Sequence, residues 1–159
     1  MKKILILLIS LVVAGCTRPE PVEPPHWSAV ELLRRQHEKA GELSPWAKFQ
    51  LAIIWTESKA NPAAIGKDND GGLYQMIPVY VEEVNRVCGT NYTHEDVFDP
   101  DKAIEIFNAM QGYYNPDKDI EEALRHHNRS SAYRAAVLRN LEIVERMEIV
   151  RSKLIEYGE

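Results

Sequence analysis

The chain has 159 residues, with 24 acidic and 19 Lys or Arg side chains, so its formal net charge is -5 at pH 7. An acidic chain lacks the basic face that binds a phosphate backbone, which argues against nucleic acid as a partner. The length is that of one domain with short extensions, and 45% hydrophobic residues are typical of a soluble globular protein.

The first 27 residues have the features of an export signal and a tether. Two lysines precede an apolar run over residues 4–14, which is too short to span a bilayer as a helix. The sequence VAGC, which ends at Cys16, then resembles the bacterial lipobox. We therefore expect a lipoprotein signal peptide over residues 1–15 and lipid on Cys16. Residues 16–27 hold four of the nine prolines, which predicts an extended tether.

A lipid on Cys16 would anchor the protein to a membrane. Thr17 follows the cysteine, and by resemblance to Gram-negative lipoproteins the lack of Asp there favours the periplasmic face of the outer membrane. An ordinary signal peptide and a short membrane anchor are the alternative interpretations. If Cys16 is lipidated, Cys88 is the only remaining thiol and no internal disulfide can form. We expect Cys88 to be a small buried side chain.

Residues 28–159 are expected to form one mainly α-helical domain with little or no β-sheet. Several expected helices begin at a Ser, Thr or Asp cap, and two of these caps are followed by proline. The expected helices span residues 29–40, 46–57, 78–87, 101–114 and 120–127, with the last and longest starting near residue 131. The last helix has an apolar residue every three or four positions. We expect the part beyond about Met147 to project as a solvated arm or to meet a partner.

The helix over residues 46–57 is apolar on nearly all sides, which is typical of a helix buried in a core. Glu57 ends it one turn after Ile53 and Ile54, so the carboxyl group continues an apolar stripe. Burial and the negative end of the helix dipole both favour the protonated acid. An acid that keeps its proton near neutral pH is suited to general acid catalysis. A solvated, frayed helix end is the alternative interpretation.

A loop rich in Gly, Asp and Asn follows this helix. It is long for a small helical domain, and long loops tend to be functional. A calcium-binding EF-hand loop needs an oxygen ligand at its fifth position, but counting from Asp68 this position is Gly72. The calcium pattern therefore fails, and the chain has no Cys/His metal cluster. We expect neither a metal nor another cofactor.

The loop carries the pattern ES..NP.A.G over residues 57–66 and then GLYQM.P over residues 72–78. This pattern resembles the soluble lytic transglycosylase (SLT) domain, a lysozyme-like helical fold with a long active-site loop whose members cut peptidoglycan. The resemblance covers roughly residues 45–141. Later motifs of the family match at residues 99–100, 126–128, 133 and 137.

The resemblance implies that Glu57 is the catalytic acid. It implies a set of substrate-binding residues, namely Ser58, Tyr74, Gln75, His127 and Asn128. Ser58 and Asn128 would orient Glu57 or the acetamido group of the substrate, whereas Tyr74 and Gln75 would line the groove. Each has a plainer alternative, because Ser58 could simply end a helix, Gln75 could be solvated and Asn128 could be a helix C-cap.

Two of these positions depart from the family. Tyr74 stands where the family usually has methionine, and His127 stands where it has a tyrosine near the catalytic glutamate. A histidine can keep a hydrogen bond to Glu57. A charged imidazolium, however, would favour the carboxylate and weaken the acid.

The resemblance implies cleavage of the β-1,4 bond between N-acetylmuramic acid and N-acetylglucosamine with formation of a 1,6-anhydro ring. A glycoside hydrolase usually needs two carboxylates, whereas ring closure by the substrate's own hydroxyl needs one. A hydrolytic lysozyme, with Asp68 or Asp70 positioning water, is one alternative. A lipoprotein that binds peptidoglycan without cutting it is another. The expected partners are peptidoglycan and a membrane, and no protein partner can be named.

Overall fold

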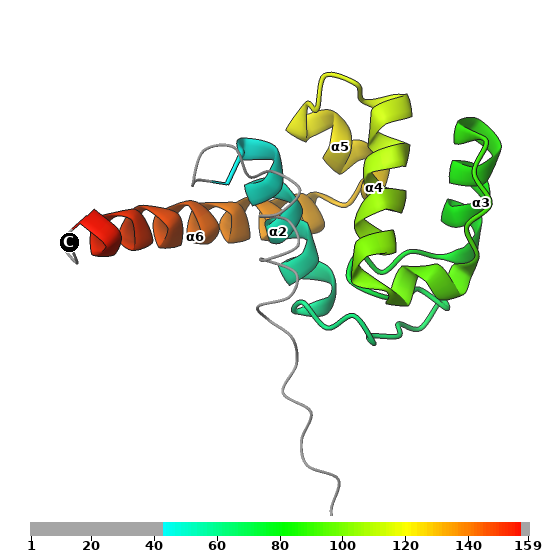
Figure 1. Cartoon of the computed structure of the whole chain (residues 1–159), viewed down its shortest axis with the longest axis horizontal. Coiled ribbons are helices and arrows are strands. Elements are labelled where there is room, and N and C mark those ends of the chain that lie inside the picture. Colours follow the sequence, from blue (N-terminus) through cyan, green and yellow to red (C-terminus); the bar gives the residue numbers. More distant parts are fainter. Residues whose placement is uncertain (1–42, 157–159) are drawn as a thin grey trace, which may run out of the picture.

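The computed structural model describes residues 43–156, and the side chains of residues 43–149. The signal peptide, Cys16, the tether and the helix expected over residues 29–40 lie outside the described residues. The described elements are α2 (Pro45–Ser58), α3 (Pro78–Cys88), the 3₁₀ helix η1 (His94–Phe98), α4 (Pro100–Tyr114), α5 (Ile120–His127) and α6 (Ser131–Glu156) (Figure 1).

The prediction of a mainly α fold is confirmed for this part of the chain. Its β structure is limited to isolated bridges that pair Gly71 with Ile65 and with Met76. No helix within residues 43–156 is long and apolar enough to cross a membrane.

Capping residues start α2, η1 and α4 where the sequence predicts them. Ser44 Oγ accepts a hydrogen bond from Ala47 N at 3.1 Å, and Asp99 Oδ1 accepts one from Asp101 N at 2.9 Å. Both caps precede a proline in the first turn. Proline has no N–H group, and at this position of a helix an N–H would have no acceptor within the helix, so no hydrogen bond is lost. Thr93 begins η1 with a capping box.

The core is built around α2, which is buried on almost all sides. The Trp46 ring lies 5.2 Å from the Phe49 ring and 6.2 Å from that of Phe107 on α4. Ile53 and Ile54 are also buried. Removing a large apolar side chain from water contributes roughly 1.5–3 kcal/mol, so this cluster holds α2 firmly. Glu57, near the end of α2, is thereby positioned from the core.

The long helix α6 begins on the core and then leaves it (Figure 1). Val137 is fully buried, and Asn140 Nδ2 donates a hydrogen bond to Thr56 Oγ1 of α2 at 2.8 Å. Ile143 and Met147 are 53% and 67% exposed. The projecting arm therefore begins near Ile143, about one helical turn before the predicted point.

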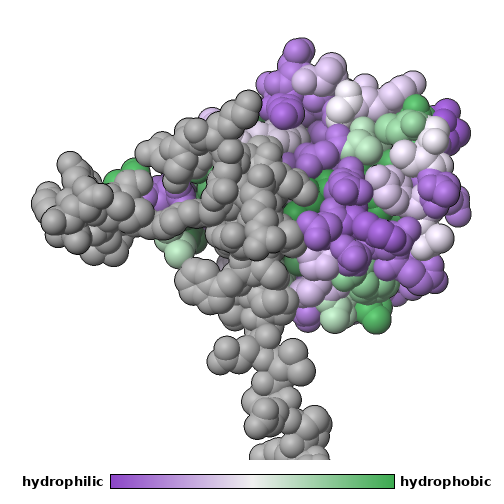
Figure 2. Space-filling model, viewed as in Figure 1, coloured by the Kyte–Doolittle hydropathy of each residue, from purple (hydrophilic) through white to green (hydrophobic). Residues whose placement is uncertain are grey.

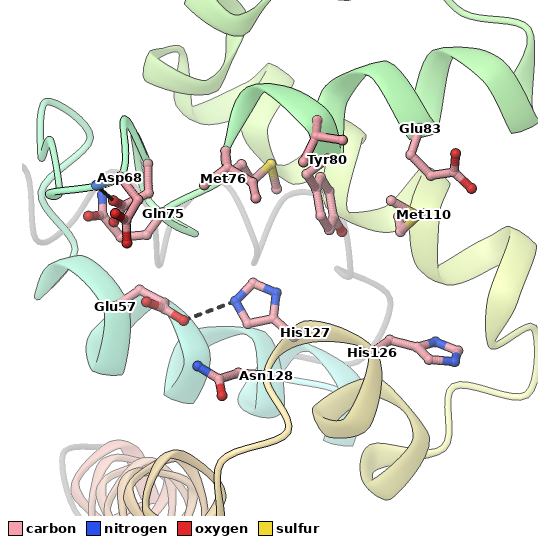
Figure 3. Close-up of a pocket in the computed structure, with 13 residues that line it drawn as sticks. Glu57, Asp68, Gln75, Met76, Tyr80, Glu83, Met110, His126, His127 and Asn128 are labelled. Carbon is pink, nitrogen blue, oxygen red and sulfur yellow. Dashed lines mark hydrogen bonds and ion pairs between the residues drawn. The ribbon is translucent and has the colours of Figure 1, made fainter.

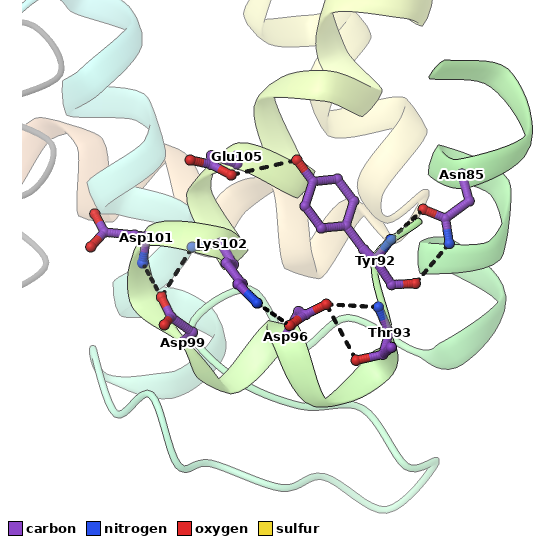
Figure 4. A network of polar contacts seen from close by, with 8 residues as sticks. All are labelled: Asn85, Tyr92, Thr93, Asp96, Asp99, Asp101, Lys102 and Glu105. Carbon is purple, nitrogen blue, oxygen red and sulfur yellow. Dashed lines mark hydrogen bonds and ion pairs between the residues drawn. The ribbon is translucent and has the colours of Figure 1, made fainter. Parts of the chain in front are cut away.

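Polar side chains connect α3, η1 and α4 (Figure 4). Asn85 Nδ2 donates to Tyr92 O at 2.7 Å, while Asn85 Oδ1 accepts from Tyr92 N at 2.8 Å. Lys102 Nζ on α4 donates to Asp96 Oδ1 at 2.5 Å. The connection between α3 and α4 is thus held by side chains as well as by the backbone.

The prediction that Cys88 is buried is wrong. Cys88 is the last residue of α3, directly before the left-handed Gly89, and it is exposed. The end of α3 has already left the core at this point. On the side of the molecule shown in Figure 2, hydrophilic residues predominate over α3 and α4, with small apolar patches between them.

Candidate active site

A cleft of about 480 Å³ lies between the end of α2, the loop after it, α3 and the end of α5 (Figure 3). It is lined by Glu57, Asp68, Asp70, Gln75, Met76, Ile77, Val79, Tyr80, Glu83, Met110, His126, His127 and Asn128. The structure therefore brings Glu57, Gln75, His127 and Asn128 together, as the sequence predicts. Ser58 and Tyr74 do not line the cleft.

Glu57 and His127 form the central polar contact of the cleft. Glu57 is the penultimate residue of α2 and His127 is the last residue of α5. His127 Nε2 lies 3.0 Å from Glu57 Oε1, and the two side chains are 8% and 18% exposed respectively. The contact is thus largely shielded from water, which strengthens it relative to an exposed pair.

Aromatic rings surround His127. The imidazole lies 6.5 Å from the Tyr80 ring, 6.1 Å from the Phe107 ring and 5.8 Å from the Tyr133 ring, measured between centroids. These rings come from α3, α4 and α6. Because close packing restricts a side chain to one rotamer, the imidazole is held in the orientation that reaches Glu57.

Two buried hydroxyl groups flank this imidazole. Neither Tyr80 Oη nor Tyr133 Oη has a hydrogen-bond partner among the described residues. Burial raises the pKa of both phenols, and the nearby Glu57 carboxyl adds to the rise for Tyr133. Both hydroxyls therefore keep their protons. A buried hydroxyl without a partner costs roughly 1–3 kcal/mol, so the Tyr80 hydroxyl is available to a ligand oxygen, whereas the Tyr133 hydroxyl lies beside the Glu57 carboxyl.

The loop after α2 has one defined backbone path. Gly72 has φ +71°, and a Cβ there would lie 1.8 Å from Val97 O, so only glycine fits against η1. Gly72 N also donates to Ala64 O at 3.0 Å, and Gly71 N donates to Met76 O at 3.0 Å. The loop that carries the family pattern is therefore tied both to itself and to η1.

The prediction that Ser58 contacts substrate is not supported by its position. Ser58 is buried, with Oγ 3.1 Å from Ile54 O and 3.0 Å from Leu73 O. Its single proton is shared between these two carbonyls. Ser58 therefore joins the end of α2 to the loop, and it acts on Glu57 only by holding the backbone.

The prediction that Tyr74 lines the groove is wrong. Tyr74 has no exposed surface. Its ring stacks on Phe107 at 4.4 Å, and its hydroxyl donates to Gln50 Oε1 at 2.9 Å. Burial raises the pKa of this phenol well above its usual value. The tight turn between the bridged residues Gly71 and Met76 places Tyr74 inside and its neighbour in the cleft.

Gln75 and Asn128 line the cleft and also hold local structure. Gln75 has φ +48°, and its Nε2 donates to Gly72 O at 2.9 Å. Asn128 is the C-cap of α5, and its Oδ1 accepts from Ser130 N at 2.9 Å. The C-cap interpretation of Asn128 is therefore correct, and it is compatible with a side chain that borders the cleft.

Sequence reasoning missed several lining residues, of which Tyr80, Glu83 and His126 are the most polar. Tyr80 and Glu83 are three positions apart on α3, so the helical period places them on one face. The period alone does not say which face meets the cleft. His126 lies inside the motif at residues 126–128, but the family resemblance implies no role for it.

Two of the other acidic groups of the cleft are already engaged. Asp70 Oδ1 accepts a hydrogen bond from Asp68 N at 3.1 Å within the loop. Glu83 accepts hydrogen bonds from Arg86 and from Tyr114, and these contacts lower its pKa to about 2. Glu57 is the acidic group that pairs with an imidazole.

The comparisons with known proteins agree with the motifs. The family model described as Transglycosylase SLT domain matches residues 35–135, well over half of the chain. Neither the curated proteins nor the solved structures give a significant match. The matched segment includes every residue of the cleft. The helical fold and the family match together show that the chain belongs to the transglycosylase SLT domain family.

Proposed function

We propose that the protein is a lytic transglycosylase that cleaves the bond between N-acetylmuramic acid and N-acetylglucosamine in peptidoglycan and leaves a 1,6-anhydro end. The observation that carries this proposal is the position of Glu57. Its carboxyl group lies in the cleft, is largely shielded from water and has an imidazole 3.0 Å away. The family match supports peptidoglycan as the substrate.

In the first step, protonated Glu57 gives its proton to the bridging oxygen. The bond between this oxygen and the anomeric carbon breaks, and its electron pair leaves with N-acetylglucosamine. The substrate's own acetamido group supports the developing positive charge. Glu57 is then a carboxylate, to which His127 Nε2–H can donate at the observed distance.

In the second step, the Glu57 carboxylate removes the proton of the 6-hydroxyl. The 6-oxygen bonds to the anomeric carbon and closes the anhydro ring, so no water is consumed. Because the nucleophile belongs to the substrate, one carboxyl group serves as acid and then as base. Asp70 and Glu83, which are engaged elsewhere, are not needed.

The remaining polar groups around the cleft have supporting roles in this proposal. Asn128 and Gln75 present amide groups to the sugar's hydroxyl and acetamido groups. The unpartnered hydroxyl of Tyr133 donates to Glu57 once the carboxylate forms. Ser58 positions the backbone that carries Glu57.

The test is digestion of purified peptidoglycan by the wild-type protein and by Glu57→Gln, followed by mass spectrometry. We expect 1,6-anhydro ends from the wild type and about a 10³-fold or greater loss of turnover in Glu57→Gln, with sacculus binding retained. Reducing ends alone would show a hydrolytic lysozyme. Binding without turnover by the wild type would show a non-catalytic peptidoglycan-binding protein.

The proposal also includes the cellular location. The lipobox at Cys16 and the following Thr17 support a lipoprotein on the periplasmic face of the outer membrane. Palmitate labelling and membrane fractionation of the full chain, with Cys16→Ser as the control, test this. Absence of label from the wild type would contradict the lipid anchor and would leave the proposed reaction unaffected.

A further inference from the structure

Two exposed tyrosines stand at the end of the cleft that lies farther from Glu57. Glu83 and His126 mark this end (Figure 3). The Tyr114 hydroxyl donates a hydrogen bond to Glu83 Oε1, and the Tyr114 ring lies 5.7 Å from the His126 ring. The Tyr113 ring lies 4.8 Å from the Tyr114 ring, almost perpendicular to it. The aromatic pair is therefore continuous with the cleft.

Both rings are exposed, and Tyr114 is held in place by its hydrogen bond to Glu83. Tyr113 is 56% exposed and Tyr114 is 40% exposed. Glu83, which holds Tyr114, also accepts from Arg86 Nε at 2.7 Å. An aromatic ring that stays exposed does not contribute the stabilisation that burial would give. Holding such a ring in one rotamer also costs side-chain entropy. A preorganised, solvent-facing aromatic pair beside polar groups is suited to binding.

A sugar ring matches this arrangement. One face of a pyranose presents C–H groups, which pack on an aromatic face, and its rim presents hydroxyls that need partners. The Glu83 carboxylate, which accepts from Arg86 and Tyr114, has further lone pairs that can accept from a sugar hydroxyl. His126 Nε2 lies 3.0 Å from Glu122 Oε1, so its other ring nitrogen is the one that can meet a sugar. Glu83 and Arg86 together carry no net charge, which suits an uncharged sugar better than the charged stem peptide of peptidoglycan.

We propose that Tyr113 and Tyr114, with Glu83 and His126, form a sugar-binding subsite that holds the glycan strand at a distance from the cleaved bond. This inference rests on the proposed function, because it assumes that a glycan occupies the cleft. The subsite lengthens the stretch of glycan that the protein contacts. Loss of the tyrosines therefore weakens binding and leaves the chemistry at Glu57 in place.

The test uses the full chain with Glu57→Gln, so that glycan binds without being cleaved. Affinity for a hexamer of N-acetylglucosamine, which has no peptide, is measured by calorimetry. We expect Tyr113→Ala and Tyr114→Ala each to weaken binding about fivefold or more. Met147→Ala, which removes another exposed apolar side chain on α6, is the matched control and should stay within about twofold.

Thermal melting shows whether each variant folds. If Tyr114→Ala does not fold, Tyr113→Ala carries the test, and Tyr114→Phe, which keeps the ring and loses only the bond to Glu83, should bind more tightly than Tyr113→Ala. In the protein without tyrosine substitutions, the hexamer should shift the ring resonances of Tyr113 and Tyr114. Unchanged affinity in the folded alanine variants, or unshifted resonances, would overturn the proposal.

Two further outcomes separate this inference from the reaction itself. If the tyrosine variants lose affinity only for a fragment that bears a stem peptide, the occupant is peptide and the sugar subsite is overturned. If Glu57 cleaves peptidoglycan as proposed but both tyrosine variants bind the hexamer normally, the subsite alone fails. If the variants lose affinity for the hexamer while the wild type shows no turnover, the subsite stands and the proposed reaction fails.

Discussion

The imidazole of His127 lies 3.0 Å from the carboxyl group of Glu57, although the two residues are 70 positions apart in the sequence. Each residue stands at the C-terminal end of its helix. The negative ends of two helix dipoles therefore meet at this contact, which favours a hydrogen-bond donor or a positive group beside the carboxyl. In this chain that group is His127.

We predict that His127→Phe lowers kcat about 10- to 100-fold with little change in KM, because it keeps an aromatic ring and removes the hydrogen bond to Glu57. His127→Tyr restores the residue of the wider family and should retain activity to within about tenfold of the wild type. Release of anhydro products from sacculi measures both. Wild-type activity in His127→Phe would show that the imidazole has no part in catalysis.

Gly72→Ala should cost roughly 2–4 kcal/mol of unfolding free energy, because a Cβ would meet Val97 O at 1.8 Å. Gly89→Ala is the matched control. Gly89 also has a positive φ, +68°, but a Cβ there meets no atom within 4 Å. Its cost should be about 1 kcal/mol, from backbone strain alone. Equal costs in urea unfolding would show that the contact with η1 is not as tight as described.

Tyr80→Phe and Tyr74→Phe remove the same atom and should have opposite consequences. Tyr80 Oη has no partner, so its removal should leave stability unchanged or raise it by up to about 1 kcal/mol. Tyr74 Oη donates to the buried Gln50 Oε1, so its removal should cost about 1–2 kcal/mol. Thermal unfolding measures both. A marked loss of stability in Tyr80→Phe would mean that its hydroxyl has a partner in solution.

Ser58→Ala should cost about 1–2 kcal/mol, because it leaves the carbonyls of Ile54 and Leu73 with one partner fewer. We also expect kcat to fall more than KM rises, since the loop and Glu57 lose a shared connection. Ser131→Ala, at an exposed position in the first turn of α6, is a suitable control. A rise in KM alone would indicate that Ser58 contacts substrate directly, as the family resemblance first suggested.

Glu83 provides a prediction for acid conditions. Its pKa is lowered from about 4.5 to about 2 by its hydrogen bonds to Arg86 and Tyr114. A carboxyl group with a lowered folded-state pKa stabilises the fold fully above its unfolded pKa, and this contribution is lost as pH falls through about 2. Titration of the Glu83 side-chain carbon by NMR should therefore show a midpoint near 2. A midpoint near 4.5 would show that these contacts do not persist in solution.

Local signals in the sequence were sufficient for the described helices and for the place of Glu57 at the end of α2. Caps such as Ser44 and Asp99 act on the next few residues, so their effect can be predicted without knowing the fold. The apolar period similarly identified α2 as a core helix. These predictions succeed because the interactions that they describe lie within one or two helical turns.

Contacts between distant segments could not be predicted in the same way. Tyr74 is buried because a tight turn points its side chain toward Phe107. The local sequence does not predict in which direction a side chain of this turn points. The position of Tyr80 beside His127 likewise depends on where the fold places α3 relative to the end of α5. Cys88 is exposed because α3 ends outside the core. In each case the deciding neighbour is far away in the sequence.

The residues that line the cleft are far apart in the sequence, which determines when the cleft can form during synthesis of the chain. Its walls come from residues between Glu57 and Asn128, so α5 must be present before the Glu57 side chain has its partner. A chain still emerging from the ribosome carries the acid but not the imidazole. The Glu57 side chain therefore meets its imidazole partner only after most of the chain has been made and has folded.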